Sequence, residues 1–331
     1  MGFTETIADD EEKTFEGYGQ ELAEMQKKRA AAGAGLKRAL HLKQHVGLVG
    51  TLEVNAAENV RSGVFAEPGR TFPVYVRISS GASVTQPDKA PDVRGFAVKL
   101  VGVEGKKLIA GMEQELTQDF LFLNDPAIPF KDPFEFMAFQ RAAAAGGAKL
   151  VPKLFQQVGL LRGFAIVGRA LSSPKVVSVA THAFHTCAPI SLAGSAAKLG
   201  LFPTPSPPRP PTTGDGMFRA DLIARLQQGP LSWSLRAQMY KDDKCTPIED
   251  TSVVWQGPWV SLGTLTLPQQ DPTSARGEEI SSLIETLSFD PWHALEAHRP
   301  VGAIMRARAH AYKWSVITRS AAPEPKSVLS L

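Results

Sequence analysis

Residues 299–319 read RPVGAIMRARAHAYKWSVITR, and this stretch decides how the rest of the chain is interpreted. It is rich in strong helix formers, and a proline is tolerated in a first helical turn, so the sequence predicts a helix from Pro300 to Arg319. On a period of 3.6 residues, Arg308, Tyr312 and Arg319 share one face, because they are spaced by four and seven residues. An arginine therefore faces a tyrosine one turn away.

This pairing has a chemical meaning beyond helix stability. A phenol titrates near pH ~10 and is normally neutral, whereas a guanidinium one turn earlier stabilises the phenolate. A tyrosinate is one of the axial ligands that haem iron accepts, and Arg319 would reach a carboxylate at the porphyrin rim. Taken alone, however, such a pair more often lies half exposed on an ordinary amphipathic helix. The rest of the chain has to separate these two interpretations.

Composition excludes several classes of protein. The chain has 331 residues, 43% of them hydrophobic and 21% charged, as in a globular protein with a substantial core. Its 36 basic and 33 acidic residues give a net charge of +3, too small to favour nucleic acid or an anionic membrane. The two cysteines have no metal-ligand spacing and suit a reducing compartment. We expect a cytoplasmic protein, with no membrane span and no signal peptide.

The pattern along the chain predicts an α+β fold. Residues 1–37 are predicted to form an N-terminal helical arm, and residues 38–331 a single domain. Strands are predicted over 46–54, 71–78, 95–101, 119–123, 231–240 and 259–267. Helices are predicted over 130–145, 148–170, 220–228, 274–287 and 300–319, with a stiff proline-rich loop over 203–211. These strands indicate an antiparallel sheet or barrel over about 46–270, followed by a helical end over about 271–320.

Polar residues stand where a plain apolar core would not place them. Arg38 and His41 precede the first strand, and Arg77 ends an apolar strand just before Ser79. Arginines at such positions, in a nearly neutral chain, call for anionic partners. A lone histidine is usually no more than a surface or hydrogen-bonded residue, so the information lies in the set of residues and not in any one of them.

Together and in this order, these residues resemble the haem catalase family. The resemblance rests on RALH at 38–41, Arg77 with Ser79, DVRGFAVK at 92–99, SWSLRAQM at 232–239, SFDP at 288–291 and the Arg308–Tyr312 pair followed by Arg319. It covers about residues 36–320 and includes neither the long N-terminal arm nor the C-terminal lobe of full-length catalases, as in the short catalase-related haem proteins. It implies an antiparallel β-barrel of about eight strands that encloses haem b, with surrounding helices.

The resemblance also implies a role for each matching residue. Tyr312 would be the proximal ligand of the haem iron, Arg308 would hold it as phenolate, and His41 would be the distal acid–base residue. The other residues similar to those that hold haem in the family are Arg38, Arg77 and Arg319 at the propionates, Ser79 behind the distal histidine, and Phe136 as a stacking aromatic.

Two positions depart from the family pattern or refine it. The family's distal asparagine falls in the string LND at 123–125; Asn124 is our choice for that role, although a strict alignment places Leu123 there. Leu40 precedes His41, where the fatty-acid-hydroperoxide isomerases of the superfamily carry threonine, and this difference favours peroxide chemistry.

The expected function is that of a haem-dependent peroxidase. It would reduce hydrogen peroxide or organic hydroperoxides through a ferryl intermediate, with weak catalase activity, and would oxidise a small organic electron donor that enters by an open haem edge. Two alternatives stay open: a fatty-acid hydroperoxide isomerase or lyase resembling allene oxide synthase, and a haem-binding protein without turnover. A homodimer is compatible with each of them.

Overall fold

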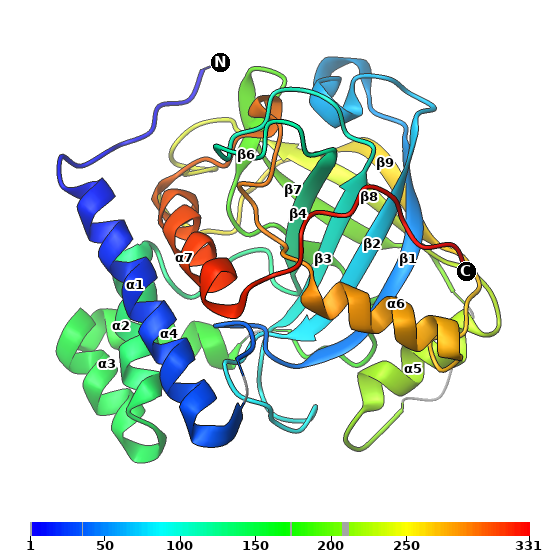
Figure 1. The fold of residues 1–331 in the computed structure, drawn as a ribbon. Helices are drawn as coiled ribbons and strands as arrows, with labels where there is room; N and C mark the ends of the chain where they lie inside the picture. The colour runs from blue at the N-terminus through cyan, green and yellow to red at the C-terminus, as the bar shows by residue number, and fades with distance from the viewer. Residues whose placement is uncertain (1, 35, 173, 207–211) are drawn as a thin grey trace.

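A closed, antiparallel β-barrel forms the centre of the computed structural model, which describes residues 2–34, 36–172, 174–206 and 212–331 (Figure 1). The strands are β1 (Gln44–Val54), β2 (Thr71–Ser80), β3 (Arg94–Val101), β4 (Thr117–Leu123), β5 (Phe184–His185), β6 (Ile190–Leu192), β7 (Ser195–Pro203), β8 (Leu231–Met239) and β9 (Trp259–Leu267). They lie in the order β5-β4-β3-β2-β1-β9-β8-β7-β6, and a β5–β7 pairing closes a ring of eight. The predicted barrel of about eight strands, with surrounding helices, is confirmed.

Alternation along the strands gives the barrel a filled interior. In β2, Val74, Val76 and Ile78 belong to the large apolar cluster to which all the long strands contribute. The residues between them, beginning with Tyr75, face the opposite way because successive side chains of a strand point to opposite faces. Tyr75 packs with Ile284 of α6 (Ala275–Thr286), so this second face is the outer wall of the barrel. Figure 1 shows α6 lying across this wall.

The remaining helices surround the barrel: α1 (Glu11–Arg29), α2 (Pro133–Ala144), α3 (Leu150–Val158), α4 (Leu160–Leu171), α5 (Met217–Leu226) and α7 (Ala303–Arg319). A π-helix over Ala30–Ala34 extends α1. Among the described residues, none of these helices combines the length and the apolar character that a membrane crossing requires.

The N-terminal helix lies alongside α7 (Figure 1). Gly19 allows this close approach, since a Cβ there would fall 2.8 Å from the carbonyl oxygen of His310. The carboxylate of Glu16 then accepts hydrogen bonds from the ring of His310 at 2.8 Å and from Nε1 of Trp314 at 2.9 Å. The arm therefore covers one side of the helix that carries Tyr312, and the division of the chain at residue 37 stays a prediction.

The structure corrects several predicted boundaries. The final helix begins at Ala303 and not at Pro300, because Gly302 has a φ of 89° and Pro300 bridges to β6. The helix predicted over 148–170 is two helices, α3 and α4, which meet at Gly159 with a φ of 81°. Strands β5, β6 and β7 were not predicted, and Pro203, placed in the proline-rich loop, ends β7. Residues 207–211 of that loop lie outside the described residues.

Candidate functional site

His41 occupies a constrained turn just before β1. Its φ of 55° lies in the left-handed region, which is uncommon for any residue other than glycine. Two hydrogen bonds hold this backbone: the amide of His41 donates to the carbonyl of Gly81 at 3.0 Å, and its carbonyl accepts from Arg77 at 2.9 Å. A strained backbone that its surroundings hold in place is common at functional positions.

The imidazole of His41 is oriented by β2 and β3. Its Nδ1 lies 3.0 Å from Oγ of Ser79, the contact that the sequence analysis expected for this pair. Ser79 pairs with Gly95 across the two strands, and a Cβ at residue 95 would fall only 2.6 Å from Nδ1 of His41. The position therefore requires glycine. The bond at Nδ1 leaves Nε2 as the ring nitrogen available to a ligand.

The imidazole is held in its neutral form. Burial is the main cause that lowers the pKa of His41 to about 3, and the positive charges of Arg77 and Arg308 add to it. A neutral imidazole at physiological pH can accept a proton, which is what a general base requires.

Arg38, Arg77 and Arg319 converge at the C-terminal end of α6. Arg38 and Arg77 share the carboxylate of Glu285 in ion pairs of 3.0 and 2.9 Å. Arg319 donates to the carbonyls of Thr286 and Leu287 at 3.0 and 2.9 Å. These carbonyls carry the partial negative charge of the helix end, which cations stabilise. The three arginines are thus brought together as predicted, but they are not unpaired.

The charges of this arginine cluster, Arg38, Arg77 and Arg319, do not cancel. Within the described part of the chain, Glu285 is the one carboxylate that forms ion pairs with it, so three guanidinium groups face one carboxylate. Burial, and then the neighbouring charges of Arg77 and Arg319, lower the pKa of Arg38 well below its usual range. Burial likewise lowers the pKa of Arg319 to about 10. Because arginine side chains are not deprotonated in proteins near neutral pH, the cluster keeps two positive charges in excess.

Tyr312 and Arg308 meet on α7 as their spacing predicts. The guanidinium of Arg308 donates to the phenol oxygen of Tyr312 at 3.1 Å and lies 5.3 Å from the centre of its ring. Tyr312 is also close enough to Arg38 and Arg77 to interact with their charges. Tyr312 and Arg308 remain half-buried, as does His41, so a ligand can still reach the group.

The strand register bears on whether Asn124 or Leu123 lies at the position of the distal asparagine. The amide of Asn124 accepts from the backbone N–H of Arg94 at 2.6 Å and donates to the carbonyl of Pro174 at 3.3 Å. Leu123 pairs with Gly95, which in turn pairs with Ser79, and directly paired residues point to the same face of a sheet. These contacts favour Leu123 as the side chain that faces His41, while the peroxide-binding role given to Asn124 stays a prediction.

Phe136 lies on α2, at some remove from these contacts. Its ring meets that of Phe130 edge to face with centroids 5.6 Å apart, and it packs partly buried against the main apolar cluster. A stacking role at a haem therefore stays a prediction.

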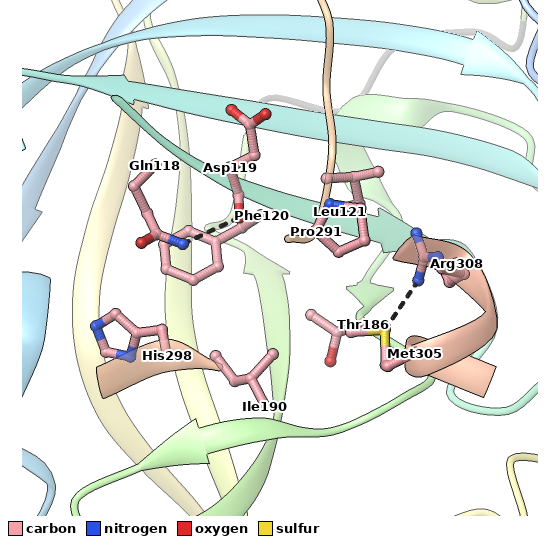
Figure 2. A pocket seen from close by; sticks show the side chains of 10 residues that line it. All are labelled: Gln118, Asp119, Phe120, Leu121, Thr186, Ile190, Pro291, His298, Met305 and Arg308. Atoms are coloured by element: carbon pink, nitrogen blue, oxygen red, sulfur yellow. Dashed lines mark hydrogen bonds between the residues drawn. The ribbon is translucent and has the colours of Figure 1, made fainter. Parts of the chain in front are cut away.

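Figure 2 shows a pocket at one end of the barrel, beside the first turns of α7. Its cavity volume is ≈ 10 Å³, about the space of a single water molecule. Arg308 and Met305 of α7 point toward it, with a guanidinium nitrogen 3.4 Å from the Met305 sulfur. Of the predicted site residues, only Arg308 lines this pocket. Arg308 therefore connects the pocket with Tyr312, while His41 and the arginine cluster lie elsewhere, on the outer wall of the barrel.

Sequence reasoning missed Glu285, the residue that organises two of the arginines. It stands 208 positions from Arg77, within a helix whose other charged side chains lie at the surface. No local pattern marks it, because its partners come from other parts of the chain. One signal could have pointed to such a residue. Two buried arginines that await one anionic ligand repel each other, so the protein needs a carboxylate between them in order to fold before the ligand binds.

Comparison with known proteins gives the fold. No family model and no curated protein matches the sequence. Similar solved structures include a fungal catalase (18% identity, TM-score 0.66, 86% of this chain and 59% of that one). Catalase A from Saccharomyces cerevisiae is 15% identical, with a TM-score of 0.63 over 86% of this chain and 61% of that one. A bacterial catalase is 16% identical, with a TM-score of 0.59 over 90% of this chain and 60% of that one.

The chain thus spans about three fifths of the length of these catalases. Identities this low show a shared fold and no more. The eight-stranded antiparallel barrel with its surrounding helices is a catalase-like fold.

Proposed function

We propose that this protein is a haem-dependent peroxidase that reduces hydrogen peroxide or organic hydroperoxides. The observation that carries the proposal is the hydrogen bond from Arg308 to the phenol of Tyr312, on a helix that faces three arginines with one carboxylate among them. A phenol next to a guanidinium is prepared to bind Fe(III) as phenolate, and tyrosinate is a known axial ligand of haem.

The charge of the site fits haem b. Three arginines and one glutamate leave two positive charges in excess, and haem b carries two propionates. Arg38, Arg77 and Arg319 would hold these carboxylates in charge-assisted hydrogen bonds, in part replacing the carbonyls of the α6 end as acceptors. Tyr312 would bind the iron, which supplies the redox centre for peroxide reduction.

His41 supplies the acid–base function. A peroxide has to lose a proton from one oxygen and gain one on the other before its O–O bond breaks. The neutral imidazole can accept the first proton at Nε2 and return it to the departing oxygen, because Ser79 and Gly95 fix the ring from the other side. A haem carrier without turnover has no need of such a residue, which is why we favour an enzyme.

Removal of the phenol oxygen tests the proposal. Tyr312→Phe should lose the haem, or lower its affinity at least about tenfold, because the ring remains and only the anionic ligand disappears. Haem content per chain and the Fe(III) absorption spectrum are the measurements. Tyr240→Phe is the matched control, since that phenol bonds only the exposed carboxylate of Asp243. Unchanged haem content and spectrum in Tyr312→Phe would sink the assignment.

Turnover separates the enzymatic alternatives. The haem-loaded protein should oxidise a small organic donor with hydrogen peroxide faster than it releases oxygen from peroxide alone, per haem and at matched concentrations. Oxygen release far above donor oxidation would make it a catalase. A faster reaction with a polyunsaturated hydroperoxide than with either would favour the isomerase, and no turnover on any of the three would leave a haem-binding protein.

A further inference from the structure

Helix α4 exposes an apolar stripe that belongs to no core. Leu161, Phe164 and Leu171 are 91%, 65% and 79% exposed. Their spacings of three and seven residues put them on one face of the helix. Leu160, the first residue of α4, and Val151 of α3 add exposures of 66% and 44%. Large side chains gathered in this way mark a surface that binds something, whereas scattered exposed leucines do not.

The stripe is distinct from the face with which α4 packs. Ile166 is 1% exposed and belongs to an apolar cluster with α2 and α3. The arginines of α4 are also turned toward the protein: Arg162 pairs with Glu135 at 2.6 Å, and Arg169 pairs with Asp125. The helix therefore has an inner face that is packed and ion-paired, and an outer face that is purely apolar.

The charged residues nearest the stripe in sequence are all basic. Between Phe136 and Gly214 the sequence contains no aspartate or glutamate, but it contains eight lysines and arginines. Lys149, Lys153 and Lys175 are exposed near the ends of α3 and α4, and none of them forms an ion pair within the described residues. Arg141, Arg162 and Arg169 of this segment pair with carboxylates and Lys198 is buried, so Lys149, Lys153 and Lys175 supply the exposed positive charge that the described residues place near the stripe.

We propose that the outer face of α3 and α4 is a docking surface for a lipid bilayer that contains anionic lipids. An amphipathic helix with basic residues beside an apolar face lies in the plane of the membrane interface, with its apolar side chains in the headgroup region. Lysines at its edges meet the negative surface of anionic lipids, each contributing independently of the others. Figure 1 shows α3 at the periphery of the molecule, away from the barrel.

The other occupants fit less well. A second copy of this chain docked face to face would bring Lys149 and Lys153 opposite the same basic segment, which like charges disfavour. An acidic protein could meet the lysines, but a bilayer accepts both the lysines and the exposed apolar side chains without a matching groove.

Vesicle flotation tests the docking surface. The purified full chain should float with vesicles in which about one lipid in three is phosphatidylglycerol, and several-fold less with pure phosphatidylcholine. Leu161→Ser/Phe164→Ser should weaken flotation about tenfold or more without unfolding the protein, since both side chains are exposed. Ile7→Ser/Val84→Ser is the matched control, because those residues are 65% and 53% exposed elsewhere on the surface. It should float like the wild type.

Each other outcome overturns the proposal. No flotation with anionic vesicles, or the same loss in both double variants, shows that the stripe does not contact lipid. Light scattering after gel filtration detects the remaining case: a wild-type dimer that Leu161→Ser/Phe164→Ser converts to a monomer makes the stripe a contact between copies. None of these readouts involves haem, so the result is independent of the proposed function.

Discussion

Two buried charge clusters lie on the outer wall of the same barrel, and they are built in opposite ways. In one, Lys99 of β3 is fully buried and pairs with Asp119 at 2.7 Å and Glu324 at 2.6 Å. In the other, Arg38 and Arg77 share Glu285, and Arg319 donates to the carbonyls of Thr286 and Leu287 beside it. We call the first the lysine cluster; Thr117 and Ser288 donate hydrogen bonds to Glu324, and Nδ1 of His293 lies 3.3 Å from its carboxylate.

The pKa of Lys99 in one cluster and that of Arg38 in the other shift in opposite directions. Burial opposes the charged form of Lys99, yet Asp119 and Glu324 overcome it and raise its pKa. For Arg38, burial and the neighbouring arginines act together and lower its pKa. The lysine cluster contains its own counter-charges and holds the C-terminal segment against the barrel. The arginine cluster keeps positive charge in excess, and under our proposal an added anion balances it; this difference would distinguish a structural charge group from a binding one.

The largest expected effect follows from breaking the lysine cluster. Lys99→Met should destabilise the protein by about 3–5 kcal/mol, because it leaves buried carboxylates without their cation. The free energy of unfolding in denaturant measures this loss. Lys106→Met is the control, since its ion pair with Glu296 is exposed and contributes less than about 1 kcal/mol. Equal stability of the two variants would contradict the comparison.

The next largest expected effect is on the rate of the reaction with peroxide, which depends on His41 beside the arginine cluster. His41→Ala should keep its haem, since the proposed ligand is Tyr312, but the haem should react with peroxide about 100-fold to 10,000-fold more slowly, the usual contribution of a positioned acid–base group. Stopped-flow absorbance gives the rate and the haem spectrum together. Ser79→Ala should slow the reaction less, because it removes only the group that orients the ring. An unaltered rate in His41→Ala would make the histidine structural.

These clusters also show what the sequence could and could not predict. The Arg308–Tyr312 contact follows from helical spacing alone, and β2, β3 and β4 follow from their alternation of apolar residues. Strand β7 was missed because Ala196, Ala197 and Gly200 lack the β-branched or aromatic character typical of strands. Since β7 closes the ring through a β5 of only two residues, no local pattern could predict the closure.

Partners distant in sequence account for the rest. Lys99 reads as an exposed lysine in a strand, and only the return of the chain 225 residues later brings Glu324 to it. The same is true of Glu285 and its arginines.

The resemblance to a family grouped His41 with Ser79 and Arg38 with Arg77, which lie close together in the structure, because it carries the tertiary information that spacing lacks. It also grouped Phe136 with them, which lies apart. It could not predict which carboxylates balance the arginines in this chain.

The buried histidine His298 predicts how the stability of the protein depends on pH. Burial lowers the pKa of His298 to about 4 from 6.5, and its neutral Nε2 accepts a hydrogen bond from the amide of Val64 at 3.0 Å. Between pH 6.5 and 4 the unfolded chain binds a proton that the folded protein does not, so stability falls as the pH drops through this window. The contribution is at most about 1.4 kcal/mol per pH unit. Melting temperatures measured from pH 7.5 to 4.5 should decline below 6.5, and His298→Gln, which keeps an acceptor but cannot titrate, should make that decline shallower. The remaining decline comes from other histidines whose pKa is lowered, such as His41 and His185. Parallel profiles would refute the assignment.

The smallest expected effect on stability is the most informative for the comparison. Arg77→Met makes the same kind of change as Lys99→Met, on the same outer wall and at a similarly buried position. Yet it removes one of three crowded positive charges, and Glu285 keeps its ion pair with Arg38. The relief of repulsion offsets the lost hydrogen bonds to Glu285 and to the carbonyl of His41, so the ligand-free protein should change in stability by less than about 1 kcal/mol.

Haem affinity should fall at least about tenfold, because one of the proposed propionate partners disappears. Denaturant unfolding without haem and a haem titration measure the two quantities on one variant. A large loss of stability with unchanged haem affinity would make the arginine cluster as structural as the lysine cluster, and the distinction between them would fail.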